Sequence, residues 1–140
     1  MRSGLGVVIV GGGPVGLTAA LLLQRRGISF VLLEAAAELP DDLRASTFHP
    51  PTLDMLDTLG IAEALIAQGL RSPTWQVRMH ETGERAVFDL SAIADATDHP
   101  FRLQCEQSKL CRLLLDRVVA GGGDVRMGLR VEEVGQDDDG

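Results

Sequence analysis

A glycine-rich turn and one acid near the start of the chain have the types and spacing to hold a phosphorylated ligand. The turn reads Gly11-Gly12-Gly13-Pro14-Val15-Gly16, and Glu34 follows it at about the 20-residue distance typical of such sites. Backbone N–H groups and the positive end of the dipole at a helix start bind phosphate oxygens. A carboxylate at this distance can accept hydrogen bonds from both hydroxyls of a ribose. The pattern predicts a dinucleotide site, at which the charge of Glu34 disfavours the 2′-phosphate of NADP.

Five residues of the turn form the predicted phosphate-binding set. Gly11 permits the tight turn, and Gly13 lets a pyrophosphate approach the backbone without a side chain between them. Gly16 lets the following helix pack closely against the sheet. Pro14 is tolerated in the first helical turn, where its missing N–H has no helical partner in any case. Val15 follows it at the start of the helix and completes the set.

Strand, helix and strand patterns surround the turn in the order that such a site requires. Residues 5–10 form an apolar run of strand length, residues 17–26 have helical character, and residues 28–33 form a second buried-type strand. This order predicts a βαβ unit with parallel strands. The alternative is a structural glycine turn in some other α/β unit, because a glycine motif alone is a weak signal in a chain with 16 glycines.

The composition excludes several classes of protein. With 140 residues, 45% of them hydrophobic and 24% charged, the chain fits one folded domain. Its net charge of −7 argues against a nucleic-acid partner, which would need a basic face. We see no apolar run of transmembrane length and no signal peptide, so we expect a cytoplasmic protein without a membrane partner. Cys105, Cys111 and the histidines lack the spacing of a metal site, which predicts reduced thiols and no metal.

The remainder of the chain predicts further helices, a hairpin and short strands. They are helices at 50–59, 61–68 and 107–120, hairpin strands at 75–80 and 86–90, and strands at 124–127 and 129–134. We expect residues 124–127 to form a third parallel strand of the main sheet. The hairpin, within residues 73–101, either walls a substrate cavity as a second β layer or decorates the surface. Asp54 and Asp57 are interpreted as a solvated helix face.

Arg44 and the last residues carry two more expectations. Arg44 follows an acidic pair, so its guanidinium either makes a weak local ion pair or lies against phosphate or flavin. Residues 136–140 read as a turn with no strand after it. We therefore expect residues 1–140 to be the N-terminal portion of a longer protein.

Taken together, these segments resemble the N-terminal part of the flavin-dependent aromatic hydroxylases, the single-component FAD monooxygenases similar to para-hydroxybenzoate hydroxylase. The resemblance rests on residues 7–17, Glu34, the block at 44–56 and the helix start at 107–114. It implies an α/β fold in which a Rossmann-like FAD-binding βαβ sheet carries an inserted β-hairpin layer. It also implies that the chain holds only the N-terminal part of the FAD-binding domain, with residues 73–101 on the substrate side.

The resemblance implies FAD as the cofactor and assigns residues to it. Gly11, Gly13 and Gly16 would hold the pyrophosphate, Glu34 the adenosine ribose, and Arg44 the region near the phosphates. In the same way, Gln107 would contact the ribityl or phosphate region. Its neighbours Gln104 and Arg102 are alternative contacts, and an ordinary helix-start residue is the alternative for Gln107 itself.

The implied reaction uses NADH or NADPH as a transient co-substrate, together with O2, to hydroxylate an aromatic or phenolic substrate. FAD carries the difficult chemistry, so no metal or nucleophilic triad is needed. We nominate no catalytic residue, because a group that activates a phenol is expected beyond Gly140. The alternatives are a related FAD oxidoreductase without oxygen insertion and an inactive FAD-binding fragment. A homo-oligomer is compatible with the sequence.

Overall fold

The computed structural model describes residues 6–41 and 45–136 and divides the chain into two compact units. The first unit combines Met1–Asp42 with Leu110–Gly140, and the second is Leu43–Lys109. Arg44 and the last four residues of the predicted terminal turn lie outside the described residues. The helices and strands of the two units confirm the α/β fold class.

The first unit is built on a parallel three-stranded sheet. Its strands are β1 (Val7–Val10), β2 (Phe30–Glu34) and β8 (Asp124–Met127). The order is β1-β2-β8, and both pairs are parallel, which confirms the predicted βαβ unit and the third strand. The first three residues of β2 are buried. A central parallel strand has neighbours on both edges and therefore favours a continuous apolar run.

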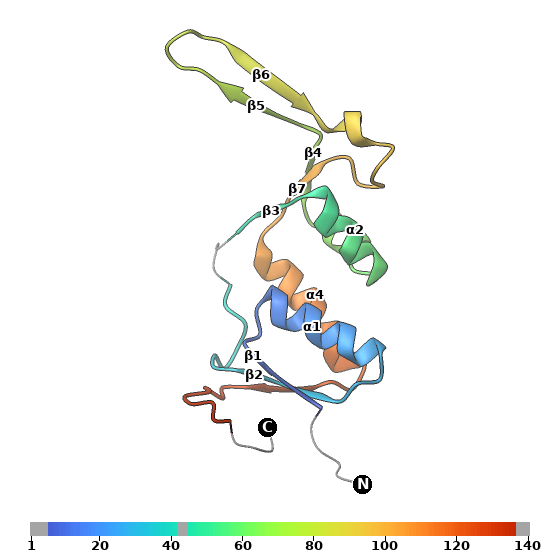
Figure 1. The fold of residues 1–140 in the computed structure, drawn as a ribbon, viewed down its shortest axis with the longest axis vertical. Helices are drawn as coiled ribbons and strands as arrows, with labels where there is room; N and C mark the ends of the chain where they lie inside the picture. Colours follow the sequence, from blue (N-terminus) through green and yellow to red (C-terminus); the bar gives the residue numbers. More distant parts are fainter. Residues whose placement is uncertain (1–5, 42–44, 137–140) are drawn as a thin grey trace. The chain divides into compact units, whose positions relative to one another are not determined.

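Two helices pack on one face of this sheet (Figure 1). They are α1 (Pro14–Arg25) and α4 (Gln107–Ala120), the second of which begins in the other unit. The side-chain amide of Gln24 in α1 donates to the carbonyl of Val118 in α4 at 2.9 Å, which joins the two helices. On β1, Val8 and Val10 are 53% and 60% exposed, so the described residues leave their face of the strand largely uncovered.

The prediction of a strand at residues 129–134 is wrong. No strand follows β8 within the described chain, which ends at residue 136. Gly128 has a φ of +73°, a conformation that glycine adopts readily, and its N–H donates to the carbonyl of Ala36 at 2.8 Å. Leu129 N–H then donates to the carbonyl of Glu34 at 2.8 Å. These two bonds tie the chain to the end of β2, and the residues beyond them have no ladder partner in the described part.

A small antiparallel sheet and two short helices form most of the second unit. They are β3 (Thr47–Phe48), α2 (Pro50–Thr58), α3 (Ala62–Ile66), β4 (Leu70–Ser72) and β7 (Arg102–Gln104). The sheet order is β3-β7-β4, and Leu103 at its centre is fully buried. Gly60 follows α2 with a φ of +66°, a left-handed conformation that glycine adopts readily at the end of a helix.

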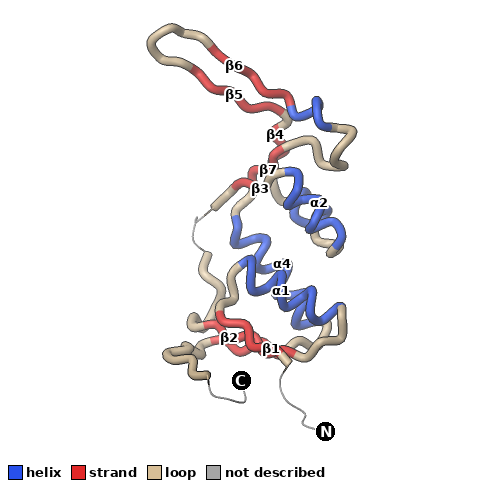
Figure 2. The backbone as a smooth tube through the Cα atoms, in the orientation of Figure 1, coloured by secondary structure: helices blue, strands red, loops and turns tan. Residues whose placement is uncertain are grey.

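The predicted hairpin is confirmed as a separate two-stranded antiparallel sheet (Figure 2). Its strands are β5 (Thr74–Arg78) and β6 (Arg85–Asp89), followed by the 3₁₀ helix η1 (Leu90–Ile93). The rings of Trp75 and Phe88 stack across the strands with centroids 4.1 Å apart and planes 10° apart. Every residue of both strands is exposed. The pairing therefore holds the hairpin together, while its role as a substrate-side layer stays a prediction.

Candidate dinucleotide site

The turn between β1 and α1 presents the first N–H groups of a helix at the surface. Gly13 is the N-cap residue, and because it has no side chain, none caps the first N–H groups of the helix. The bond from Leu17 N–H to the carbonyl of Gly13 is 3.0 Å long, so the N–H groups of Val15 and Gly16 lie in the first turn, ahead of the helical ladder. Val15 is 82% exposed. Within the described chain the helix start is therefore open to an anionic ligand.

The glycines of the turn have different neighbours. Gly11 has a φ of +104°, which favours glycine. A Cβ atom on Gly16 would lie 2.0 Å from the Gly11 carbonyl oxygen and 3.2 Å from a methyl carbon of Ile9, so the turn itself requires glycine there. By contrast, a Cβ on Gly13 would have no atom within 4 Å. Among the described residues, the space above Gly13 is therefore open.

Glu34 points its carboxylate at the turn. Its Oε2 accepts a hydrogen bond from Gly12 N–H at 2.6 Å, and its Oε1 accepts one from Ala36 N–H at 2.8 Å. The bond from Ala36, and next the bond from Gly12, lower the pKa of Glu34 below its ordinary value. The group is therefore a charged acceptor at neutral pH. Each of its oxygens has lone-pair capacity beyond one backbone bond, which a ribose hydroxyl can use.

Gly12 and Ala36 contact Glu34, and sequence reasoning missed both contacts. A Cβ on Gly12 would lie 3.2 Å from both Cβ and Oε2 of Glu34, so this glycine allows the acid to approach the turn. Both residues act through their backbone N–H groups. Residue type carries no signal for such a bond, although the middle glycine of a three-glycine run could have suggested a close neighbour.

The remaining predicted site residues belong to the second unit or lie outside the described chain. Gln107 is the first residue of α4, is half-buried, and donates its backbone N–H to the carbonyl of Ala45 at 2.8 Å. Of the two alternatives to it, Gln104 already bonds the hydroxyls of Ser46 and Thr47 through its side-chain amide. The other, Arg102, has a buried Nε without a partner among the described residues. The first unit thus brings the glycine turn and Glu34 together, and Arg44 is not described.

Asp54 is partly exposed, as a solvated face predicts, with 38% of its side chain accessible, but it also has two partners that were not predicted. Its Oδ1 accepts a hydrogen bond from Thr97 Oγ1 at 2.8 Å and lies 2.7 Å from His99 Nδ1. The bond to His99, and next the bond to Thr97, lower the pKa of Asp54. His99 is only 9% exposed. Forty-five residues separate the two partners, and no local pattern reports such a contact.

Three other features of the described residues bear on chemistry. No three His, Cys, Asp or Glu side chains are arranged to hold a metal ion. Cys105 and Cys111 are free and buried, and burial raises the pKa of both thiols. No helix in the described part is long and apolar enough to cross a membrane.

Comparisons with known proteins show which family the chain resembles. The family described as FAD binding domain matches residues 5–140. The 6-hydroxy-3-succinoylpyridine 3-monooxygenase of Pseudomonas putida is 40% identical over 81% of this chain and 29% of its own. The para-nitrophenol 4-monooxygenase of a Pseudomonas strain is 36% identical over 95% of this chain and 33% of its own.

A solved structure shows the same fold. The crystal structure of p-nitrophenol 4-monooxygenase from Pseudomonas putida matches with a TM-score of 0.87 and 34% identity, covering 95% of this chain and 34% of that chain. The chain therefore spans about a third of the length of the relatives that it matches.

Proposed function

The chain belongs to the family of FAD binding domains, and from this premise we propose that the whole protein is an FAD-dependent monooxygenase. It uses NADH or NADPH and O2 to hydroxylate an aromatic or phenolic substrate. The observation that carries the proposal is the bond between Glu34 and Gly12 beside the open backbone of Gly13. This arrangement has the two parts that an adenine dinucleotide needs, a phosphate cradle and a ribose acceptor.

Each part of the site has a defined task. The N–H groups at the start of α1 hold the pyrophosphate, and Gly13 keeps the approach to them clear. Glu34 accepts hydrogen bonds from the adenosine ribose, and its negative charge repels the 2′-phosphate of NADP. Gln107 contacts the ribityl or phosphate region, and Arg44 the phosphates. When bound, FAD supplies the electron transfer from NAD(P)H and the activation of O2 that side chains alone cannot provide.

The substrate class follows from the relatives. Two of them are named for a hydroxypyridine and a nitrophenol, both small rings with polar substituents. Both are named monooxygenases, which favours oxygen insertion over a plain oxidoreductase. We place the hairpin of β5 and β6 on the substrate side, because the stacked Trp75 and Phe88 are exposed and available to face a ring. A cytoplasmic location agrees with the free thiols of Cys105 and Cys111.

The test is oxygen incorporation by the purified full-length protein. We expect the protein to hold FAD, to oxidise NADH or NADPH faster when a suitable phenol is present, and to place one atom of ¹⁸O2 in the product. Hydrogen peroxide formation without labelled product across a broad panel of phenols and hydroxypyridines would overturn oxygen insertion and favour the oxidoreductase alternative. Failure to retain FAD would overturn the site itself.

A further inference from the structure

Arg102 in β7 has an unpaired buried donor. The Nε of its guanidinium is the single buried side-chain nitrogen or oxygen that has no hydrogen-bond partner among the described residues. Buried polar groups in proteins are almost always hydrogen-bonded. A guanidinium N–H can only donate, so the missing partner is an acceptor. An acceptor from outside the described residues is therefore expected at this position.

The pairing of β7 with β4 determines which face of the small sheet Arg102 occupies. Ser72 lies opposite Arg102, and Leu70 lies opposite Gln104. Paired residues share a face and successive residues alternate between faces, so these two pairs lie on one face. Leu103, between Arg102 and Gln104, lies on the other face and is fully buried. Arg102 is therefore on the face of the sheet away from this core.

The polar neighbours on the same face have other partners. The side-chain amide of Gln104 donates to Ser46 Oγ at 2.7 Å, and its oxygen accepts from Thr47 Oγ1 at 3.3 Å. Ser72 Oγ donates to the carbonyl of Thr74 at 3.2 Å. These groups hold one another in place, and none of them serves the buried Nε.

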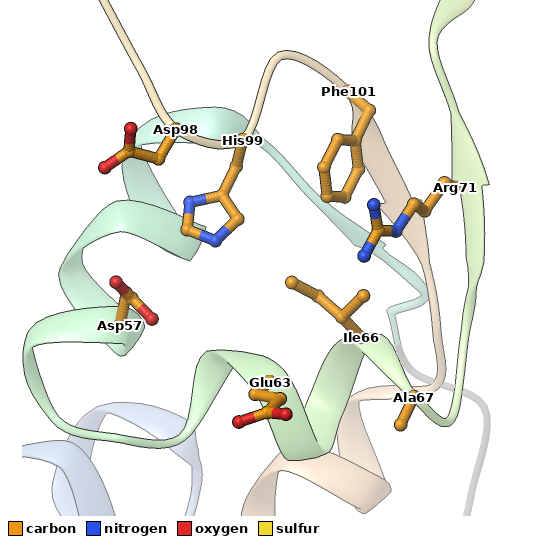
Figure 3. A pocket seen from close by; sticks show the side chains of 8 residues that line it. All are labelled: Asp57, Glu63, Ile66, Ala67, Arg71, Asp98, His99 and Phe101. Atoms are coloured by element: carbon orange, nitrogen blue, oxygen red, sulfur yellow. The ribbon is translucent and has the colours of Figure 1, made fainter.

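Arg71 is a second arginine of this sheet, on the opposite face. It is paired with Leu103 in the ladder. Its guanidinium carbon lies 4.8 Å from the centroid of the Phe101 ring, in a pocket that His99 also lines (Figure 3). The face of an aromatic ring attracts a cation without a hydrogen-bond acceptor. The two arginines thus carry the same charge on opposite faces and differ in their surroundings.

A second pocket adjoins the face that carries Arg102. Its volume is about 590 Å³, and Leu70 and Gln104 are among the residues that line it. This pair lies two residues along the strands from Ser72 and Arg102, a separation of about 7 Å. Leu70 is 74% exposed and offers apolar surface to a ligand. The face therefore combines space for a ring with an unpaired cationic donor beside it.

We propose that Arg102 binds a carboxylate on the aromatic substrate, an inference that rests on the proposed function for the nature of the ligand. Nε–H and a terminal N–H of one guanidinium form a planar fork that matches the two oxygens of a carboxylate. Ser72, the ladder partner of Arg102, is followed after one residue by β5 of the hairpin, which we place on the substrate side. FAD has no carboxylate, so the substrate supplies it.

The test uses the full-length protein with its bound flavin and without NAD(P)H, so that binding is measured without turnover. The probes are the ortho, meta and para hydroxybenzoates and the matching hydroxybenzamides, in which a neutral amide replaces the carboxylate. We expect calorimetry at neutral pH to show that at least one hydroxybenzoate binds about tenfold or more tightly than its amide. The ratio of the two dissociation constants is the quantity compared between variants.

Substitutions at the two arginines decide whether Arg102 reads the carboxylate. Arg102→Met removes the fork and should bring the ratio to about one. Arg102→Lys keeps the charge without the fork and should give an intermediate ratio, and it replaces the methionine variant if that variant does not fold. Arg71→Met removes the same charge from the opposite face and should leave the ratio unchanged.

Several results would overturn the proposal. They are equal binding of acid and amide by the wild type, no saturable binding of any hydroxybenzoate, an unchanged ratio in the Arg102 variants, and an equal loss in Arg71→Met. Weaker retention of FAD in Arg102→Lys at an unchanged ratio would assign the guanidinium to the cofactor instead. Absence of ¹⁸O from the product would overturn oxygen insertion alone, because the calorimetric ratio does not depend on turnover.

Discussion

Glu34 accepts a hydrogen bond from the backbone N–H of Gly12 at 2.6 Å, across 22 residues of sequence. Its other oxygen accepts from Ala36 N–H at 2.8 Å. The acid therefore joins the end of β2 to the glycine turn and is held rigidly where a ribose is expected. One carboxylate shapes the turn and, in our proposal, also binds the ligand, so substitutions at Glu34 should affect both stability and FAD affinity.

Replacing Glu34 by glutamine should weaken FAD binding. The amide keeps the shape of the side chain but presents a single acceptor oxygen to two backbone N–H donors. Loss of charged hydrogen bonds typically costs about 1–3 kcal/mol, or roughly 5- to 150-fold in the dissociation constant. Fluorescence titration of the apoprotein with FAD measures this change. Glu38→Gln, at an exposed acid after the same strand, is the matched control, and an unchanged affinity in Glu34→Gln would count against the ribose role.

The contribution of Glu34 to stability should depend on pH. Its pKa in the folded protein is lowered from the ordinary value of 4.5, because the bonds from Ala36 and Gly12 favour the charged form. The unfolded chain therefore takes up the proton first, and the stabilisation is present above pH 4.5 and is lost as the pH falls through the lower, folded-state pKa. Denaturant titrations from pH 7 to pH 3 should show the wild type and Glu34→Gln converging in acid. A constant difference between them would contradict this account.

Two glycine substitutions should separate ligand binding from folding. In Gly13→Val the Cβ meets no atom of the described residues within 4 Å, and the residue has an extended backbone with φ near −75°. The fold should survive while the yellow colour of bound FAD is lost. In Gly16→Ala the Cβ would lie 2.0 Å from the Gly11 carbonyl oxygen, so the turn itself should be destabilised. Circular dichroism and flavin absorbance of both purified variants check these outcomes, and a yellow Gly13→Val protein would refute the site.

Replacing Asp54 by asparagine should destabilise the second unit. The substitution removes the charge that accepts from both Thr97 and the buried His99. Leaving a buried donor poorly paired costs more than losing an exposed bond. Hydrogen exchange should become faster in α2 and in the loop that carries His99. Asp57→Asn changes an exposed acid of the same helix and should leave this exchange unaltered; equal protection in the two variants would contradict the structural role of Asp54.

The local parts of the fold were predictable because each rests on a short-range rule. The apolar runs of β1 and β2, the glycine positions of the turn and the period of α4 depend on neighbouring residues. The strand predicted at 129–134 failed, because an alternating pattern becomes a strand only when another strand pairs with it. The remote partnership of Asp54 with His99 was missed because it joins residues far apart in sequence.

The sequence by itself determined the order of strand, glycine turn, helix and acid, since backbone conformation and apolar periodicity are local properties. Only the tertiary structure decided what the acid does. The parallel pairing of β1 with β2 brings Glu34 within 2.6 Å of Gly12, and the fold of the second unit directs His99 into a pocket. Both arrangements bring together residues that are far apart along the chain. A local pattern of residue types does not report such distances.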